Sequence, residues 1–155
     1  MARISQFDRF RTQMAVLVPL TRALREKLGQ EAADALVAEV LDEIARKQAA
    51  KQVADGQTMT VAKLQAGMRA FSADDALEYE ELSDDDGAYD FDVRRCRYSE
   101  HMEALGARDL GPLLVCRSDI PAAEAMHIDL ERSQTLMTGA PCCDFRYRLR
   151  GDDAS

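Results

Sequence analysis

The sequence predicts an α+β domain in which N-terminal helices pack on a four-stranded antiparallel sheet built from two hairpins. Between positions 5 and 71 apolar residues recur every three or four positions, the spacing of one helical face, whereas near the C-terminus they alternate with polar residues. Between these parts, residues 74–92 contain ten acidic residues and no Lys or Arg. The resulting order of helices, hairpin, helices and hairpin favours an antiparallel sheet.

The length of 155 residues fits one domain with a core of its own. We expect this domain to span 1–150, with a helical layer over 1–73 and the sheet with its intervening helices over 74–150. Residues 151–155 are expected to form a frayed tail.

The first helix is expected over residues 5–27, with Gly29 as its stop signal. Pro19 cannot donate a backbone hydrogen bond, so this helix should kink there or divide into two. Leu36, Val40 and Ile44 give a second helical stripe that runs to about Ala54. A third helix begins after Thr60, a good N-cap residue, and ends at Ser72.

The acidic segment is interpreted as a solvated hairpin, with strands over 77–82 and 89–93 and a turn over 83–87. It lacks the spacing and the terminal Glu of a calcium loop. Short helices are expected over 99–105, after 109–112 and from Pro121. Alternating apolar and polar residues predict a second pair of strands over 127–137 and 143–149.

Charge and motifs exclude several classes of function. A net charge of -8 and a pI near 4.8 are unsuited to a nucleic-acid partner, which requires concentrated Lys and Arg. No segment is long and apolar enough to insert into a membrane. Four cysteines without a disulfide-rich pattern favour a reducing cytoplasm. Nucleotide-binding and serine-hydrolase motifs are absent.

Cys96 is a candidate reactive thiol. It lies where a strand passes into a helix, within two residues of Arg94, Arg95 and Arg97. Positive charge and a helix N-terminus both lower the pKa of a thiol, so we expect Cys96 to be the nucleophile. The alternative is a small apolar side chain at a strand end.

Two further cysteines are expected to converge with Cys96 on one pocket. Cys116 ends an apolar run, and one more helical turn would place Asp119 on the same side. Cys143 faces inward on the last strand, whereas Cys142 should point away. A zinc site made by the three thiols is an alternative, but their separations are not those of known zinc motifs.

Four segments together resemble the L-2-amino-thiazoline-4-carboxylic acid hydrolase family. They are FDVRRCRY at 91–98, MEALG at 102–106, LLVCRSD at 113–119 and ERSQTLMTGAPCCDFR at 131–146. The resemblance implies hydrolytic opening of a cyclic amidine, 2-amino-thiazoline-4-carboxylate, to N-carbamoyl-cysteine. It covers about residues 90–148.

The resemblance implies a small-molecule substrate and a set of site residues. We expect Cys96, Asp119 and Cys143 to carry the chemistry, and Arg132, Thr135 and Cys116 to bind the substrate. Asp119 would direct protonation of the amidinium, and Arg132 would hold the substrate carboxylate. The alternative for Arg132 is a strand residue held in a salt bridge within the protein.

A more distant resemblance links the C-terminal end to the vinyl reductase type of small-molecule-binding domain. Sensors of that type bind zinc through a glutamate and a cysteine, and Arg132 and Thr135 stand at those positions here. Because these zinc ligands are missing, we expect the protein to have no metal cofactor. The alternative function is a small-molecule or metal-binding module without catalysis, and a homo-oligomer is a further expectation.

Overall fold

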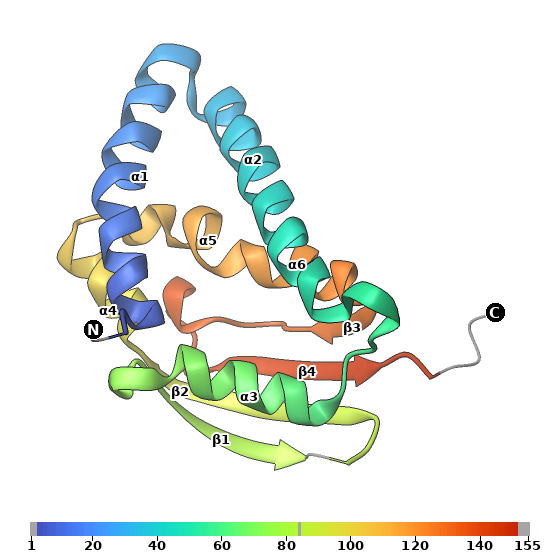
Figure 1. Ribbon diagram of the computed structural model, residues 1–155. Coiled ribbons are helices and arrows are strands. Elements are labelled where there is room, and N and C mark those ends of the chain that lie inside the picture. The colour runs from blue at the N-terminus through green and yellow to red at the C-terminus, as the bar shows by residue number, and fades with distance from the viewer. Residues whose placement is uncertain (1–2, 84, 152–155) are drawn as a thin grey trace.

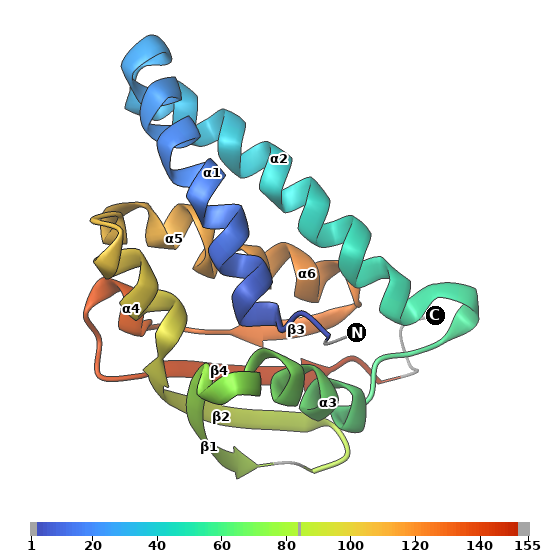
Figure 2. The ribbon, with the colours of Figure 1, turned by 60° about the vertical axis from the view of Figure 1, so that its left-hand side comes forward.

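The computed structural model describes residues 3–83 and 85–151 and confirms the α+β class. Four antiparallel strands form one sheet in the order β1-β2-β4-β3. Helices lie over one side of the sheet, and a long helical hairpin stands up from that layer (Figures 1 and 2). The strands are β1 (Leu77–Ser83), β2 (Ala88–Cys96), β3 (Ile128–Glu131) and β4 (Cys143–Leu149).

The hairpin consists of α1 (Gln6–Leu28) and α2 (Gln30–Ala50). The Ser5 side chain accepts the backbone N–H of Asp8 and so caps the start of α1. Gly29 has a φ of 83°, a conformation that residues with a Cβ rarely adopt, and this lets the chain reverse direction between the two helices. The expected stop at Gly29 is therefore confirmed.

Pro19 does not divide the first helix, since α1 continues through it from Gln6 to Leu28. The carbonyl group that loses its usual donor belongs to Ala15, and Ala15 and Pro19 are both exposed. Water can therefore satisfy this carbonyl oxygen, which removes one reason for the helix to break.

The apolar stripe on α2 faces solvent. Leu36, Val40 and Ile44 are each at least 45% exposed. The inward face of α2 instead carries Asp42, whose carboxylate accepts two hydrogen bonds from Arg117 at 2.7 and 2.9 Å. The helix is also shorter than expected, because a 3-10 segment, Lys51–Gly56, follows Ala50.

The third helix, α3 (Val61–Phe71), begins as predicted, since the Thr60 hydroxyl accepts the N–H of Lys63 at 3.2 Å. It lies against β2 on the inner face of the sheet (Figure 1). The inner face of the sheet carries a second apolar group with Phe91 and Cys143. The largest apolar cluster joins α1 to the helices that follow β2; its buried members are Phe7, Phe10, Met14, Ala76, Tyr98, Met102, Ala107, Leu110, Leu114 and Met137.

The acidic segment forms the predicted hairpin, and arginines neutralise part of its charge. Asp92, which is buried, accepts a hydrogen bond from Arg146 on β4 at 2.9 Å. Asp90 on β2 pairs with Arg148, which is also on β4. Glu78 pairs with Arg95 across β1 and β2. The outer face of the sheet is therefore held by ion pairs between strands.

The strand expected over 127–137 is too long, since β3 ends at Glu131. Beyond it, the backbone N–H groups of Ser133 and Gln134 donate to the Asp144 carboxylate at 2.9 and 2.8 Å. The Asp144 side chain thus accepts backbone N–H groups that would otherwise continue the pairing of β3 with β4. The chain then leaves the sheet and forms a 3-10 segment, Leu136–Thr138.

The helices after β2 are α4 (Arg97–Ala104), α5 (Gly111–Leu114) and α6 (Asp119–Ala125). They agree with the expected short helices. Of the residues that the structure describes, no helix is long and apolar enough to cross a membrane. The expected hairpin turn includes residue 84 and the expected tail includes 152–155, which lie outside the described residues. The domain limits of 1–150 stay a prediction.

Two glycines offer a test of the packing between α5 and the 132–142 loop. A Cβ on Gly111 would overlap the buried Met137 side chain, 2.5 Å from its Cγ, whereas nothing lies within 4 Å of a Cβ on Gly67 in α3. We expect Gly111→Ala to lower the free energy of unfolding by about 1–3 kcal/mol. Gly67→Ala should raise it by roughly 0.5–1 kcal/mol through helix propensity. Urea denaturation of both variants measures the difference, and a stable Gly111→Ala protein would contradict this packing.

Candidate functional site

Three cysteines meet at one end of the sheet. Cys96 ends β2, Cys143 begins β4, and Cys116 lies between α5 and α6. Because β2 and β4 are antiparallel neighbours, the end of one strand lies beside the start of the other, with Val93 opposite Cys143. The segment from α5 to α6 runs above the sheet toward the start of β3 (Figures 1 and 2).

The three thiols share packing neighbours, because Cys96 and Cys116 contact the largest apolar cluster and Cys96 also contacts the sheet cluster that contains Cys143. The pocket expected around them stays a prediction. Ionisation of Cys96 or Cys143 raises the pKa of Cys116, and ionisation of Cys96 raises that of Cys143, although burial has the larger effect on each. Such mutual influence requires the thiols to lie in one neighbourhood. All three are free thiols.

Cys96 does cap the N-terminus of α4, as its sequence position suggests. Its Sγ accepts the backbone N–H of Ser99 at 3.4 Å. Burial nevertheless raises the pKa of the Cys96 thiol, and the hydrogen bonds from Ser99 oppose this effect only in part. The expectation of a lowered pKa at Cys96 is therefore wrong.

The arginines around Cys96 have other partners, which explains the error. Arg94 pairs with Asp92 at 3.1 Å, and Arg95 pairs with Glu78 and Glu100. Arg97 donates to the carbonyl of Asp74 and lies over the Phe7 ring. Alternation along β2 places Arg95 on the face opposite to Cys96, and the register shift between Glu78 and Tyr79 leaves Arg94 as an extra residue that pairs with acidic side chains. Sequence proximity to Cys96 therefore places little positive charge at its sulfur.

The other two thiols are also held in the neutral form. Burial raises the pKa of Cys116 to about 12 and that of Cys143 to about 11, while Arg132 lowers both. The Cys143 Sγ accepts the backbone N–H of Leu136 at 3.2 Å. A base beside these thiols is therefore needed before either can act as a thiolate.

Asp119 and Arg132 form an ion pair beside the thiols. The Arg132 Nη1 lies 2.6 Å from the Asp119 Oδ2, and its Nη2 donates to the Cys116 carbonyl at 3.0 Å. Burial raises the pKa of Asp119, although Arg132 opposes the shift. The Asp119 side chain is still 37% exposed. This carboxylate is thus crowded by protein yet reachable by water.

Two aromatic side chains of β4 line the same region. Phe145 carries the Arg132 guanidinium over its ring, 5.3 Å from the centroid. Tyr147 is close enough to Asp119 and Arg132 for their charges to affect its pKa, which burial raises strongly. Both rings are only half-buried although β4 is a central strand. The sequence assigned them to the apolar face but gave no sign that they remain accessible.

Thr135 and Cys142 lie in the loop before β4. The Thr135 hydroxyl lies 3.1 Å from that of Thr138, and its backbone carbonyl accepts the N–H of Ala140, so it shapes the loop before β4. Cys142 is buried but outside the core clusters that contain the other three cysteines. A role for Thr135 in substrate binding stays a prediction.

The thiols and Asp119 are not grouped as metal ligands in the part of the chain that the structure describes. Within residues 3–83 and 85–151, no group of three or more His, Cys, Asp or Glu side chains is arranged to hold a metal ion. The two histidines lie elsewhere, His101 beside Phe7 and Phe10 and His127 at the start of β3. The ion pair with Arg132 further reduces the availability of Asp119 as a ligand.

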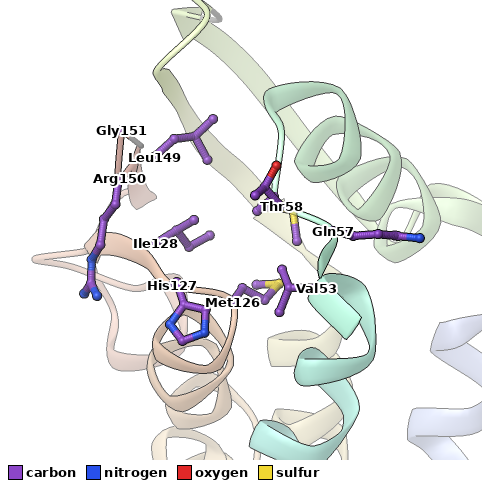
Figure 3. Close-up of a pocket in the computed structure, with 10 residues that line it drawn as sticks. Val53, Gln57, Thr58, Met126, His127, Ile128, Leu149, Arg150 and Gly151 are labelled. Atoms are coloured by element: carbon purple, nitrogen blue, oxygen red, sulfur yellow. The ribbon is translucent and has the colours of Figure 1, made fainter. Parts of the chain in front are cut away.

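A separate cavity of about 370 Å³ opens at the other end of β3 and β4 (Figure 3). Its lining includes Val53, Met126 and Ile128, with His127 and Arg150 at the side. Because the cavity borders the last residue of β4, it lies about 20 Å along the strand from Cys143. It is therefore distinct from the site at the thiols.

Comparison with known proteins agrees with the four segments that carry the resemblance. A family model described as L-2-amino-thiazoline-4-carboxylic acid hydrolase matches residues 9–147. The match includes α1 and α2, beyond the C-terminal half in which the resemblance was found. A search of curated proteins gives no match.

The raised thiol pKa values predict slow alkylation of the folded protein. A higher pKa means less thiolate at a given pH, so at pH 8 Cys143 should carry roughly a hundredfold less thiolate than an unshifted cysteine. We expect iodoacetamide to label Cys96, Cys116 and Cys143 slowly at pH 8 and faster as the pH rises toward 11. Peptide mass spectrometry, with the urea-unfolded chain as control, measures each site. Rapid labelling of Cys96 at pH 7 would contradict the shift.

Proposed function

Because this chain belongs to the L-2-amino-thiazoline-4-carboxylic acid hydrolase family, we propose that it hydrolyses a cyclic amidine such as 2-amino-thiazoline-4-carboxylate to N-carbamoyl-cysteine. The observation that carries the proposal is the Asp119–Arg132 pair beside the converging thiols. It supplies a proton acceptor and a cation at the place where sulfur nucleophiles gather. These are the groups that an amidine hydrolysis requires.

Cys143 is the proposed nucleophile. Asp119 raises the pKa of Cys116 and Cys143, which indicates that it lies near both, and Cys143 is also held by the N–H of Leu136. Asp119 would accept the Cys143 proton, since a carboxyl group with a raised pKa is a stronger base. A catalytic role for Cys96, which begins the next helix, stays a prediction.

The reaction balances with water as the only co-substrate. The Cys143 sulfur attacks C2 of the ring, the bond from C2 to the ring sulfur breaks, and the leaving sulfur takes the proton from Asp119. Water then attacks C2 of the S-linked isothiourea and the bond from C2 to the Cys143 sulfur breaks. One proton of the water goes to the imine nitrogen of the former ring, and the other passes through Asp119 to the Cys143 sulfur. The product is N-carbamoyl-cysteine and the free thiol returns.

Arg132 is proposed to bind the substrate carboxylate. A guanidinium has five N–H donors, and two hydrogen bonds from Arg132 go to Asp119 and to the Cys116 carbonyl. A remaining donor can reach a bound carboxylate. The Phe145 ring beneath the guanidinium would contact the planar heterocycle. Cys116 would lie beside the bound substrate.

Turnover of 2-amino-thiazoline-4-carboxylate tests this function. We expect Cys143→Ala and Asp119→Asn each to reduce kcat by a factor of about 10²–10⁴, because each removes a group that acts in the transition state. Cys142→Ala, next to Cys143 in the chain, should retain activity. Formation of N-carbamoyl-cysteine is measured by mass spectrometry.

Three results would count against the proposal. An active Cys143→Ala protein together with an inactive Cys96→Ala protein would transfer the nucleophile to Cys96. A wild-type protein that binds the amidine without turnover would favour the alternative, a small-molecule-binding module. Near-stoichiometric zinc in the purified protein would favour a metal-binding module instead.

A further inference from the structure

The helical hairpin exposes a concentration of apolar side chains. Six large apolar residues on α1 and α2 have exposed fractions of 45% or more. Isolated exposed apolar residues are common, but groups of this size on a water-soluble domain mark contact surfaces. Five of the six, Val16, Leu20, Leu36, Val40 and Ile44, form the outer apolar face.

On α1 the exposed residues point away from the body of the protein. Successive residues of a helix are about 100° apart, so Val16 lies about 200° from Met14, and Leu20 about 200° from Arg22. Met14 is buried in the main core cluster, and Arg22 donates to Asp109 beyond α4. Val16 and Leu20 therefore share the outer side.

On α2 the same geometry holds. Val40 lies about 200° from Asp42, which faces inward to Arg117. Leu36 and Ile44 lie one turn before and after Val40, so the three residues form a row along the outer side of α2. The outer apolar face thus extends over both helices of the hairpin.

The two rows lie at the same height in the hairpin. Val16 and Leu20 are centred on position 18, and the row on α2 is centred on position 40. Gly29, where the chain reverses, is midway between these positions. With a rise of 1.5 Å per residue, each row is centred about 16 Å from the turn. A two-fold axis at this height would place apolar rows of one copy on those of another, the condition for an isologous contact.

Charge also favours a second copy as the occupant. The hairpin, residues 6–50, contains seven acidic and seven basic residues, so the chain's net charge of -8 arises entirely outside it. Two acidic proteins repel each other most weakly through such a neutral surface. A neutral face also offers little attraction to a polyanion or to an anionic membrane.

We propose that the outer apolar face is the interface of a homodimer, in which two hairpins pack as a four-helix arrangement. Roughly half-exposed Val, Leu and Ile side chains supply on the order of 400–500 Å² of apolar surface per copy. A standard interface buries about 800 Å² per partner, more than half of it apolar. The face therefore suffices for a stable dimer. This inference is independent of the proposed function.

Light scattering after size exclusion tests the proposal on the full chain. We expect the wild-type protein to have twice the 17.2 kDa chain mass. Val40→Glu should yield the single-chain mass, because it buries an unpaired charge in the interface, and should raise the dissociation constant at least about a hundredfold. Leu20→Lys, on the other helix and with the opposite charge, should do the same.

Leu82→Glu is the matched control. Leu82 and Val40 are both 49% exposed, and both variants add one negative charge, but Leu82 lies on the edge strand β1. We expect Leu82→Glu to remain dimeric, and circular dichroism should show unchanged helix content in all variants. A monomeric wild-type protein would overturn the proposal, as would dimers that persist in both Val40→Glu and Leu20→Lys.

Discussion

The pairing of β2 with β4 is the constraint on which the rest of the structure depends. These strands come from different hairpins, and their register places Val93 opposite Cys143 and Asp92 opposite Asp144. Side chains alternate between the two faces of a sheet, so a slip by one residue would turn the thiol outward and the arginines inward. The ion pair of Asp92 with Arg146 on the outer face opposes such a slip. The ion pairs on the outer face of the sheet thereby fix the position of Cys143 on the inner face.

Local signals in the sequence were sufficient for most of the fold. Thr60 marks a helix start because its hydroxyl accepts a backbone N–H of the first turn, and Gly29 marks a helix end because it can adopt a positive φ. The alternation over 143–149 predicts β4. The expected strand over 127–137 was too long because alternation does not reveal that Asp144 takes the next N–H groups. Periodicity also could not show which stripe of α2 faces the body, since apolar residues are assigned inward by default.

The proximity of the thiols could be predicted from the sequence, but their pKa values could not. Cys96 and Cys143 could be brought together because each lies at a strand end. The pKa of Cys96 could not be predicted, since it depends on where long arginine side chains find partners, and Glu78, Glu100 and Asp92 are those partners. Accessibility of Phe145 and Tyr147 depends on how α5 and α6 lie over β4, a tertiary property without a local signal.

The sulfur atoms of Cys96 and Cys143 accept backbone hydrogen bonds in addition to being candidate reactive groups. The Cys96 Sγ holds the first turn of α4 through Ser99, and the Cys143 Sγ holds the loop before β4 through Leu136. A covalent bond formed at either sulfur adds bulk where a backbone N–H now points. The first turn of α4 or the Leu136–Thr138 segment would have to yield to it. Chemistry at either sulfur atom would therefore move the backbone beside the thiols.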